Sequence, residues 1–180
     1  MEIPQITSKL STRPVQFPDC CLSISTTLLH TLASLLPRQP GFTLSIGSGS
    51  GLLEALVSQS DPQISIEGVE VASDVNRYIA EEHMHVAGGA WDLYARAKQA
   101  SAWMFVYPRE PRLVSRYIET YGNGDENGDG RPEMIVWLGP KVDWVDYEVC
   151  FRQSRYCELW VLGEEEGLAP YESAVVARRV

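Results

Sequence analysis

Hydrophobic and polar positions along the chain alternate between short apolar runs and stretches with helical spacing. The apolar runs are rich in β-branched residues and end at Gly, Pro or polar residues, which predicts β-strands; they cover residues 42–46, 64–71, 85–87, 102–107, 134–138, 157–162 and 173–177. The stretches between them predict helices over residues 19–36, 52–57, 73–82, 91–99, 112–121 and 143–152. This order is typical of an α/β protein whose mostly parallel, seven-stranded sheet is covered by helices on both faces.

The two ends of the chain depart from this alternation. Residues 1–18 are rich in Pro, Ser and Thr, which predicts an arm that packs along the surface or is partly disordered. The last two strands follow one another without a helix and therefore predict an antiparallel pair that closes the sheet. We expect residues 19–180 to form one domain, because a chain of 180 residues, 44% of them hydrophobic, can bury one substantial core but not two.

Composition and charge narrow the classes of function. A formal net charge of −9 argues against nonspecific nucleic-acid binding, which depends on clustered Lys and Arg, although a specific RNA contact at one patch stays open. Residues 1–10 lack the basic start and apolar run of a signal peptide, and the apolar stretches are too short to span a bilayer, so we expect an intracellular, cytoplasmic protein without a membrane partner. The four cysteines contain no CxxC pair and predict neither a disulfide framework nor a zinc site.

A glycine turn joins the first expected strand to the helix that follows it. Gly47, Gly49 and Gly51 allow the backbone to approach a ligand closely, because glycine has no Cβ and tolerates positive φ. Dinucleotide-binding turns have the spacing G-x-G-x-x-G, whereas this chain has Leu52 at the position of the third glycine. The spacing therefore disfavours a nicotinamide oxidoreductase, which stays as a minor alternative.

The segment from Leu44 to Gly51, followed by Glu70 at the end of the second strand, resembles the first two motifs of class I methyltransferases that use S-adenosylmethionine (SAM). This resemblance covers about residues 42–180 and implies a three-layer, Rossmann-like fold with SAM as cofactor. In that family the glycine turn packs against the methionine and ribose parts of SAM, and an acidic residue such as Glu70 accepts hydrogen bonds from the ribose hydroxyls. Ser45 departs from the family pattern, which has Asp or Glu two residues before the first glycine and uses it in the contacts around the methionine amino group.

The resemblance implies a further set of contacts at the ends of the third and fourth strands. Residues 88–92 fall where the family contacts adenine, and the Trp91 ring is suited to stacking there; alternatively, Trp91 lies in the core and Asp92 begins a helix. The implied cofactor site as a whole consists of Gly47, Ser48, Gly49, Gly51, Glu70, Val71, Gly89, Ala90, Trp91 and Tyr107.

Residues 107–111 leave the fourth strand at the sheet edge where ligands bind in open α/β sheets. Tyr107 and Arg109 are therefore the candidate catalytic residues. Tyr107 could orient a substrate or act as a weak base, and Arg109 could bind an acidic group. The alternative is that this segment is a turn with a surface arginine and has no catalytic role. Family members that methylate amino groups often carry an Asn-Pro-Pro-Tyr type motif at this position. This chain lacks that motif, so its sequence does not support amino methylation.

Two other patterns suggest metals only weakly. His83 and His85 would share one face of a strand, but a third ligand with a recognisable spacing is missing. Residues 125–130, within the expected loop 122–130, imitate the first half of a calcium loop, yet Val136 stands where the bidentate Glu belongs. We therefore expect no bound metal.

The sequence thus predicts SAM-dependent methyl transfer to an unidentified acceptor. No long insertion is available to form a lid, which suggests an open cleft, a macromolecular acceptor or a partner protein that completes the site. The alternative is a methyltransferase-fold protein that no longer methylates and acts as a binding or scaffold subunit, which Ser45 and the missing catalytic motif would explain.

Overall fold

A computed structural model describes residues 1–123 and 132–180 of the chain. Within these residues the strands form one open sheet in the order β3-β2-β1-β4-β5-β7-β6. The strands are β1 (Thr43–Ile46), β2 (Ile66–Glu70), β3 (Met84–Val86), β4 (Ala102–Val106), β5 (Met134–Pro140), β6 (Glu158–Leu162) and β7 (Glu172–Arg178). Strand β7 lies antiparallel to both β5 and β6, whereas the other neighbouring pairs are parallel.

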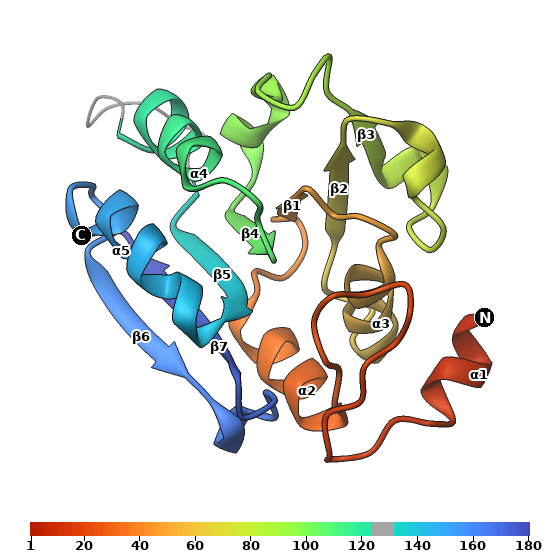
Figure 1. The fold of residues 1–180 in the computed structure, drawn as a ribbon. Coiled ribbons are helices and arrows are strands. Elements are labelled where there is room, and N and C mark those ends of the chain that lie inside the picture. Colours follow the sequence, from red (N-terminus) through yellow and green to blue (C-terminus); the bar gives the residue numbers. More distant parts are fainter. Residues whose placement is uncertain (124–131) are drawn as a thin grey trace.

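Helices cover both faces of this sheet, so the molecule has three layers (Figure 1). The described helices are α1 (Ile3–Thr7), α2 (Thr26–Leu35), α3 (Leu52–Ser60), α4 (Pro111–Tyr117) and α5 (Trp144–Arg152). Helices α2 and α3 pack on one face and α4 and α5 on the other. Strand β4 supplies both cores, because Met104 points to the first face, and Trp103 and Phe105 point to the second.

The expected strands, their parallel order and the closing antiparallel pair are confirmed, with small shifts at the ends. Strands β1, β2, β4, β5 and β7 are buried along most of their length, and strands buried on both faces read as nearly continuous hydrophobic runs, which explains why the pattern located them. The edge strands β3 and β6 contain no fully buried residue. The fold class is therefore the three-layer α/β arrangement that the sequence predicts.

The first expected helix begins later than the pattern indicated. Ser25, and not Asp19, caps α2: its hydroxyl accepts a hydrogen bond from the Leu28 backbone N–H at 3.0 Å. The Asp19 carboxylate instead accepts hydrogen bonds from Arg77 and Tyr78, each at 2.8 Å. Leu22 and Ile24 lie before α2, in a loop, and are fully buried there, so these apolar positions reflect burial of a loop and not a helix.

Two further predicted helices, 73–82 and 91–99, are wrong. The first region contains only the short 3₁₀ turns Ser73–Val75 and Glu81–His83, because the Asn76 side chain bonds to both the N–H and the C=O of Ile79 and so replaces helical hydrogen bonds. The second contains the 3₁₀ turn Ala95–Gln99, whose Ala97 carbonyl accepts from the Trp103 indole instead of continuing an α-helix.

The helix predicted over 112–121 is α4 followed by one wider turn, Ile118–Gly122. Most of the expected loop 122–130, with the calcium-like residues Asp125, Asn127 and Asp129, lies outside the described residues. The strand β5 that follows contains Val136 in the core.

The first 18 residues contribute to the core. Ile6 of α1 and Phe17 are only 1% and 5% exposed, and both pack with α2 and α3. A two-way backbone bridge joins Val15 to Ile24 at 2.9 and 2.8 Å. The bridge closes residues 15–24 into a loop that reaches the carboxyl end of the sheet.

Candidate cofactor pocket

A pocket of about 560 Å³ lies at the carboxyl ends of β1, β2 and β4. Its walls are built from residues in the stretches 19–21, 46–54, 70–75, 90–91 and 106–113. Strand β1 stands between β2 and β4, so the order of strands reverses beside it, and ligands of open α/β sheets bind at such a point.

The glycine turn forms one wall of this pocket. Gly47, Gly49 and Gly51 have φ values of 72°, 58° and 76°, which residues other than glycine rarely adopt. A Cβ added to Gly47 or Gly49 would meet nothing within 4 Å, so both face open space. Gly51 does not line the pocket; a Cβ there would lie 2.5 Å from Ile79 Cγ1, so this glycine permits packing.

Glu70 lies at the end of β2 and is tied to the glycine turn. Its Oε1 accepts the Gly49 N–H at 2.7 Å, and its Oε2 accepts the Val71 N–H at 3.1 Å. A carboxylate has about four acceptor positions, so two such bonds leave capacity for a ligand. Ser48 and Val71, also expected at the site, line the pocket with Glu70.

Of the residues predicted to contact adenine, Ala90 and Trp91 line the pocket, whereas Gly89 does not. The Trp91 side chain is 46% exposed, which contradicts its alternative placement in the core. The alternative helix beginning at Asp92 is absent as well, since residues 91–94 are not helical.

Tyr107 and Arg109 both line the pocket beyond β4. Tyr107 has a positive φ of 48°, and its hydroxyl donates a 2.7 Å hydrogen bond to Oε1 of the fully buried Glu172. Burial and this hydrogen bond to a carboxylate raise the pKa of Tyr107. The geometry therefore disfavours Tyr107 as a general base.

Two parts of the pocket were missed by sequence reasoning. Glu54 on α3 lines it at 2% exposure, and Ser45 Oγ donates a 2.6 Å hydrogen bond to Glu54 Oε1. Burial raises the pKa of Glu54 to about 7. The available signal was an acidic residue among the apolar positions of a helix that follows a glycine turn. Residues 19–21 carried no such signal, because tertiary contacts alone bring them to the pocket.

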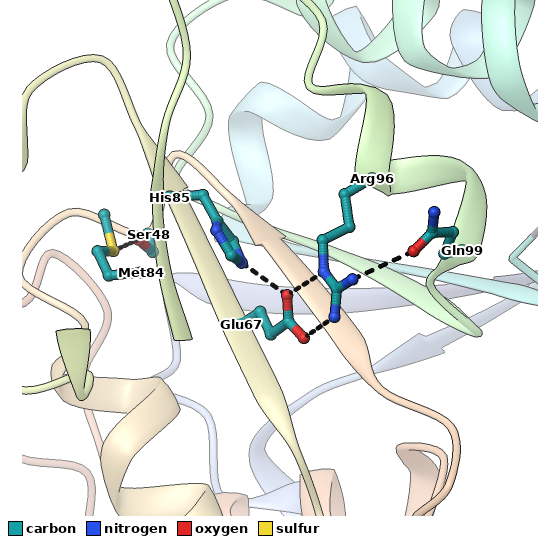
Figure 2. A network of polar contacts seen from close by, with 6 residues as sticks. All are labelled: Ser48, Glu67, Met84, His85, Arg96 and Gln99. Atoms are coloured by element: carbon teal, nitrogen blue, oxygen red, sulfur yellow. Dashed lines mark hydrogen bonds and ion pairs between the residues drawn. The ribbon is translucent and has the colours of Figure 1, made fainter. Parts of the chain in front are cut away.

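His85 belongs to a separate polar network (Figure 2). Its Nε2 lies 2.6 Å from Oε2 of Glu67 on β2, and the Arg96 guanidinium donates to both Glu67 oxygens at 2.6 Å. Burial alone would raise the pKa of Glu67, but the hydrogen bonds from Arg96 and His85 outweigh it and lower that pKa. None of these three residues lines the pocket, and the described residues include no cluster of three or more His, Cys, Asp or Glu side chains suited to a metal.

Comparison with known proteins identifies the fold. No protein-family model and no curated protein sequence matches the chain. Among solved structures, the methyltransferase domain of bacterial CtHen1-C has a TM-score of 0.60 at 13% identity, covering 85% of this chain and 95% of that chain. Precorrin-6y C5,15-methyltransferase from Geobacter metallireducens has a TM-score of 0.60 at 11% identity, covering 96% and 100%. Geranyl diphosphate methyltransferase, solved with GPP and sinefungin, has a TM-score of 0.59 at 13% identity, covering 87% and 79%.

The chain therefore has the fold of the class I methyltransferases. The names of these neighbours include quite different acceptors, so the likeness defines the fold and leaves the acceptor open. Within the described residues, no helix is both long and apolar enough to cross a membrane.

Proposed function

We propose that the protein binds SAM and transfers its methyl group to an acceptor that enters beside residues 107–111. The observation that carries this proposal is the Glu70 carboxylate, joined to a turn of positive-φ glycines at the ligand edge of a methyltransferase fold.

The residues present suit this cofactor. Gly47 and Gly49 turn open backbone toward the pocket, and Glu70 retains acceptor positions for a pair of hydroxyl donors such as those of a ribose. Trp91 offers an exposed ring for stacking on a planar base. The pocket volume of about 560 Å³ lies in the ordinary range for small-molecule sites.

When bound, SAM would supply an activated methyl group on a positively charged sulfur. The contribution of the protein is then mostly alignment of donor and acceptor, with a base needed only if the acceptor must lose a proton. Tyr107 shapes the reaction edge through its fixed hydroxyl, and Arg109 is suited to binding an acidic group of the acceptor.

Calorimetric titration with SAM and with S-adenosylhomocysteine tests this proposal. We expect micromolar affinity, about −8 kcal/mol at 1 μM, and its loss in the Glu70→Ala variant, since that change removes the carboxylate at the pocket. Absence of both heat and a thermal shift in the wild-type protein at millimolar ligand would contradict the proposal.

A second candidate function is a binding or scaffold protein that takes up the cofactor without transferring methyl groups. It is favoured by the Tyr107–Glu172 hydrogen bond, which removes the candidate base at the reaction edge. Tritium-labelled SAM incubated with protein, RNA and small-molecule fractions separates the two candidates. Label transfer by the wild type but not by Glu70→Ala supports the enzyme, whereas binding without transfer in every fraction supports the scaffold.

A further inference from the structure

Four carboxylate side chains line the pocket, those of Asp19, Glu54, Glu70 and Glu110, and Glu54 is the buried one among them. Glu54 lies in the first turn of α3, three residues after the last glycine of the turn, and lines the pocket while only 2% exposed. Its Oε1 accepts the Ser45 hydroxyl at 2.6 Å. Ser45 is fully buried on β1, so the carboxylate is held from both the strand and the helix that flank the glycine turn.

Glu54 has no paired cation among the described residues, although Arg109 lines the same pocket. Of the ion pairs formed by the described residues, none involves Glu54. The charge of Glu70 adds to burial in raising the pKa of Glu54. Burial and the charge of Glu54 in turn raise the pKa of the neighbouring Cys20 thiol to about 12. A buried carboxylate without a cation is costly, and one that lines a pocket is a candidate ligand-binding group.

We propose that Glu54, held by Ser45, binds the α-ammonium group of the methionine part of SAM. This inference rests on the proposed function, since it assigns a role within the same cofactor site. An ammonium group offers three N–H donors and a positive charge, and charge-assisted hydrogen bonds to a carboxylate are the strong ones. The sulfonium of SAM carries a charge but no N–H donor, so it does not match this acceptor equally well.

The assignment also explains why Ser45 stands at the end of β1. A serine hydroxyl alone could not neutralise an ammonium group, but it donates to and fixes the carboxylate of Glu54. The negative charge for this part of the ligand therefore comes from helix α3 and not from strand β1.

Two ligands that differ at the relevant group test the inference. S-adenosylhomocysteine carries the α-ammonium group, whereas 5′-methylthioadenosine keeps the adenosine and sulfur but lacks the amino acid. In calorimetry at pH 8, we expect Glu54→Gln to weaken S-adenosylhomocysteine binding by about 10- to 100-fold, the usual range for a hydrogen bond between charged groups. Binding of 5′-methylthioadenosine should not change. The exposed Glu119→Gln serves as the matched control and should affect neither ligand.

A pH series gives a second readout. Wild-type affinity for S-adenosylhomocysteine should rise about tenfold from pH 6 to pH 8 as Glu54 ionises through a pKa near 7, and this rise should disappear in Glu54→Gln. If the variant weakens both ligands equally, or neither, the assignment of Glu54 is wrong while the cofactor site stands. If the wild-type protein binds neither ligand, the proposed function fails and this inference fails with it.

Discussion

Replacing Glu54 with Gln should change how the stability of the free protein depends on pH. The pKa of the carboxyl is 4.5 in its ordinary state and about 7 in the fold, so between these values the folded chain keeps a proton that the unfolded chain has lost. Stability contributed by this group is therefore present below pH 4.5 and decreases as the pH rises to 7. Gln preserves the shape and an acceptor for the Ser45 hydroxyl but cannot ionise.

The expected size follows from the pKa difference. A shift from 4.5 to about 7 corresponds to about 3 kcal/mol of unfolding free energy lost by the wild type and not by the variant. Urea denaturation of both proteins between pH 4.5 and pH 8 measures this, because the other titrating groups cancel in the difference between the two curves. The variant should gain stability relative to the wild type by about that amount at pH 8. Parallel curves over the whole pH range would refute the reasoning.

Two further predictions concern the glycine turn and the polar network. Gly51→Ala should lower the free energy of unfolding, measured by urea denaturation, by about 2–4 kcal/mol, because it combines a left-handed φ with a Cβ 2.5 Å from Ile79 Cγ1. Gly49→Ala has open space around it and should lower that free energy by only about 1–2 kcal/mol. Equal losses in the two variants would contradict the packing role of Gly51. Arg96→Gln should cost about 1–2 kcal/mol at pH 8, as it removes charged hydrogen bonds to Glu67 from a partly exposed partner. This loss should shrink as the pH falls below 4.5, because Glu67 then takes up a proton; a loss independent of pH would argue against the ion pair.

The sequence was most informative where the determinants are local. Buried strands and the glycine turn are set by residues next to one another, and Glu70 follows from its place at a strand end. The helix predicted over 73–82 failed because Asn76 satisfies the backbone of Ile79 with its side chain, a competition that periodicity does not show.

The part of the pocket that the sequence did not predict depends on long-range contacts instead. Glu54 has the spacing of an ordinary helical residue, and its hydrogen-bond partner is a hydroxyl nine positions earlier that only folding brings within 2.6 Å. Residues 19–21 reach the pocket through the contacts of Asp19 with Arg77 and Tyr78, nearly 60 positions along the chain. Such long-range contacts leave no periodic trace in the sequence.

The pocket walls come from stretches of chain that begin at residue 19 and end at residue 113. A ligand bound there can persist only while β1, β2, β4 and the N-terminal loop are all in place, so partial opening of any one of them releases it. Occupancy is thus linked to the cooperative stability of most of the domain, and a ligand present at 100 times its dissociation constant adds about 2.7 kcal/mol to the free energy of unfolding. A cell that supplies the cofactor in excess would thereby lengthen the lifetime of the folded chain, and cofactor depletion would expose the whole domain to unfolding and proteolysis.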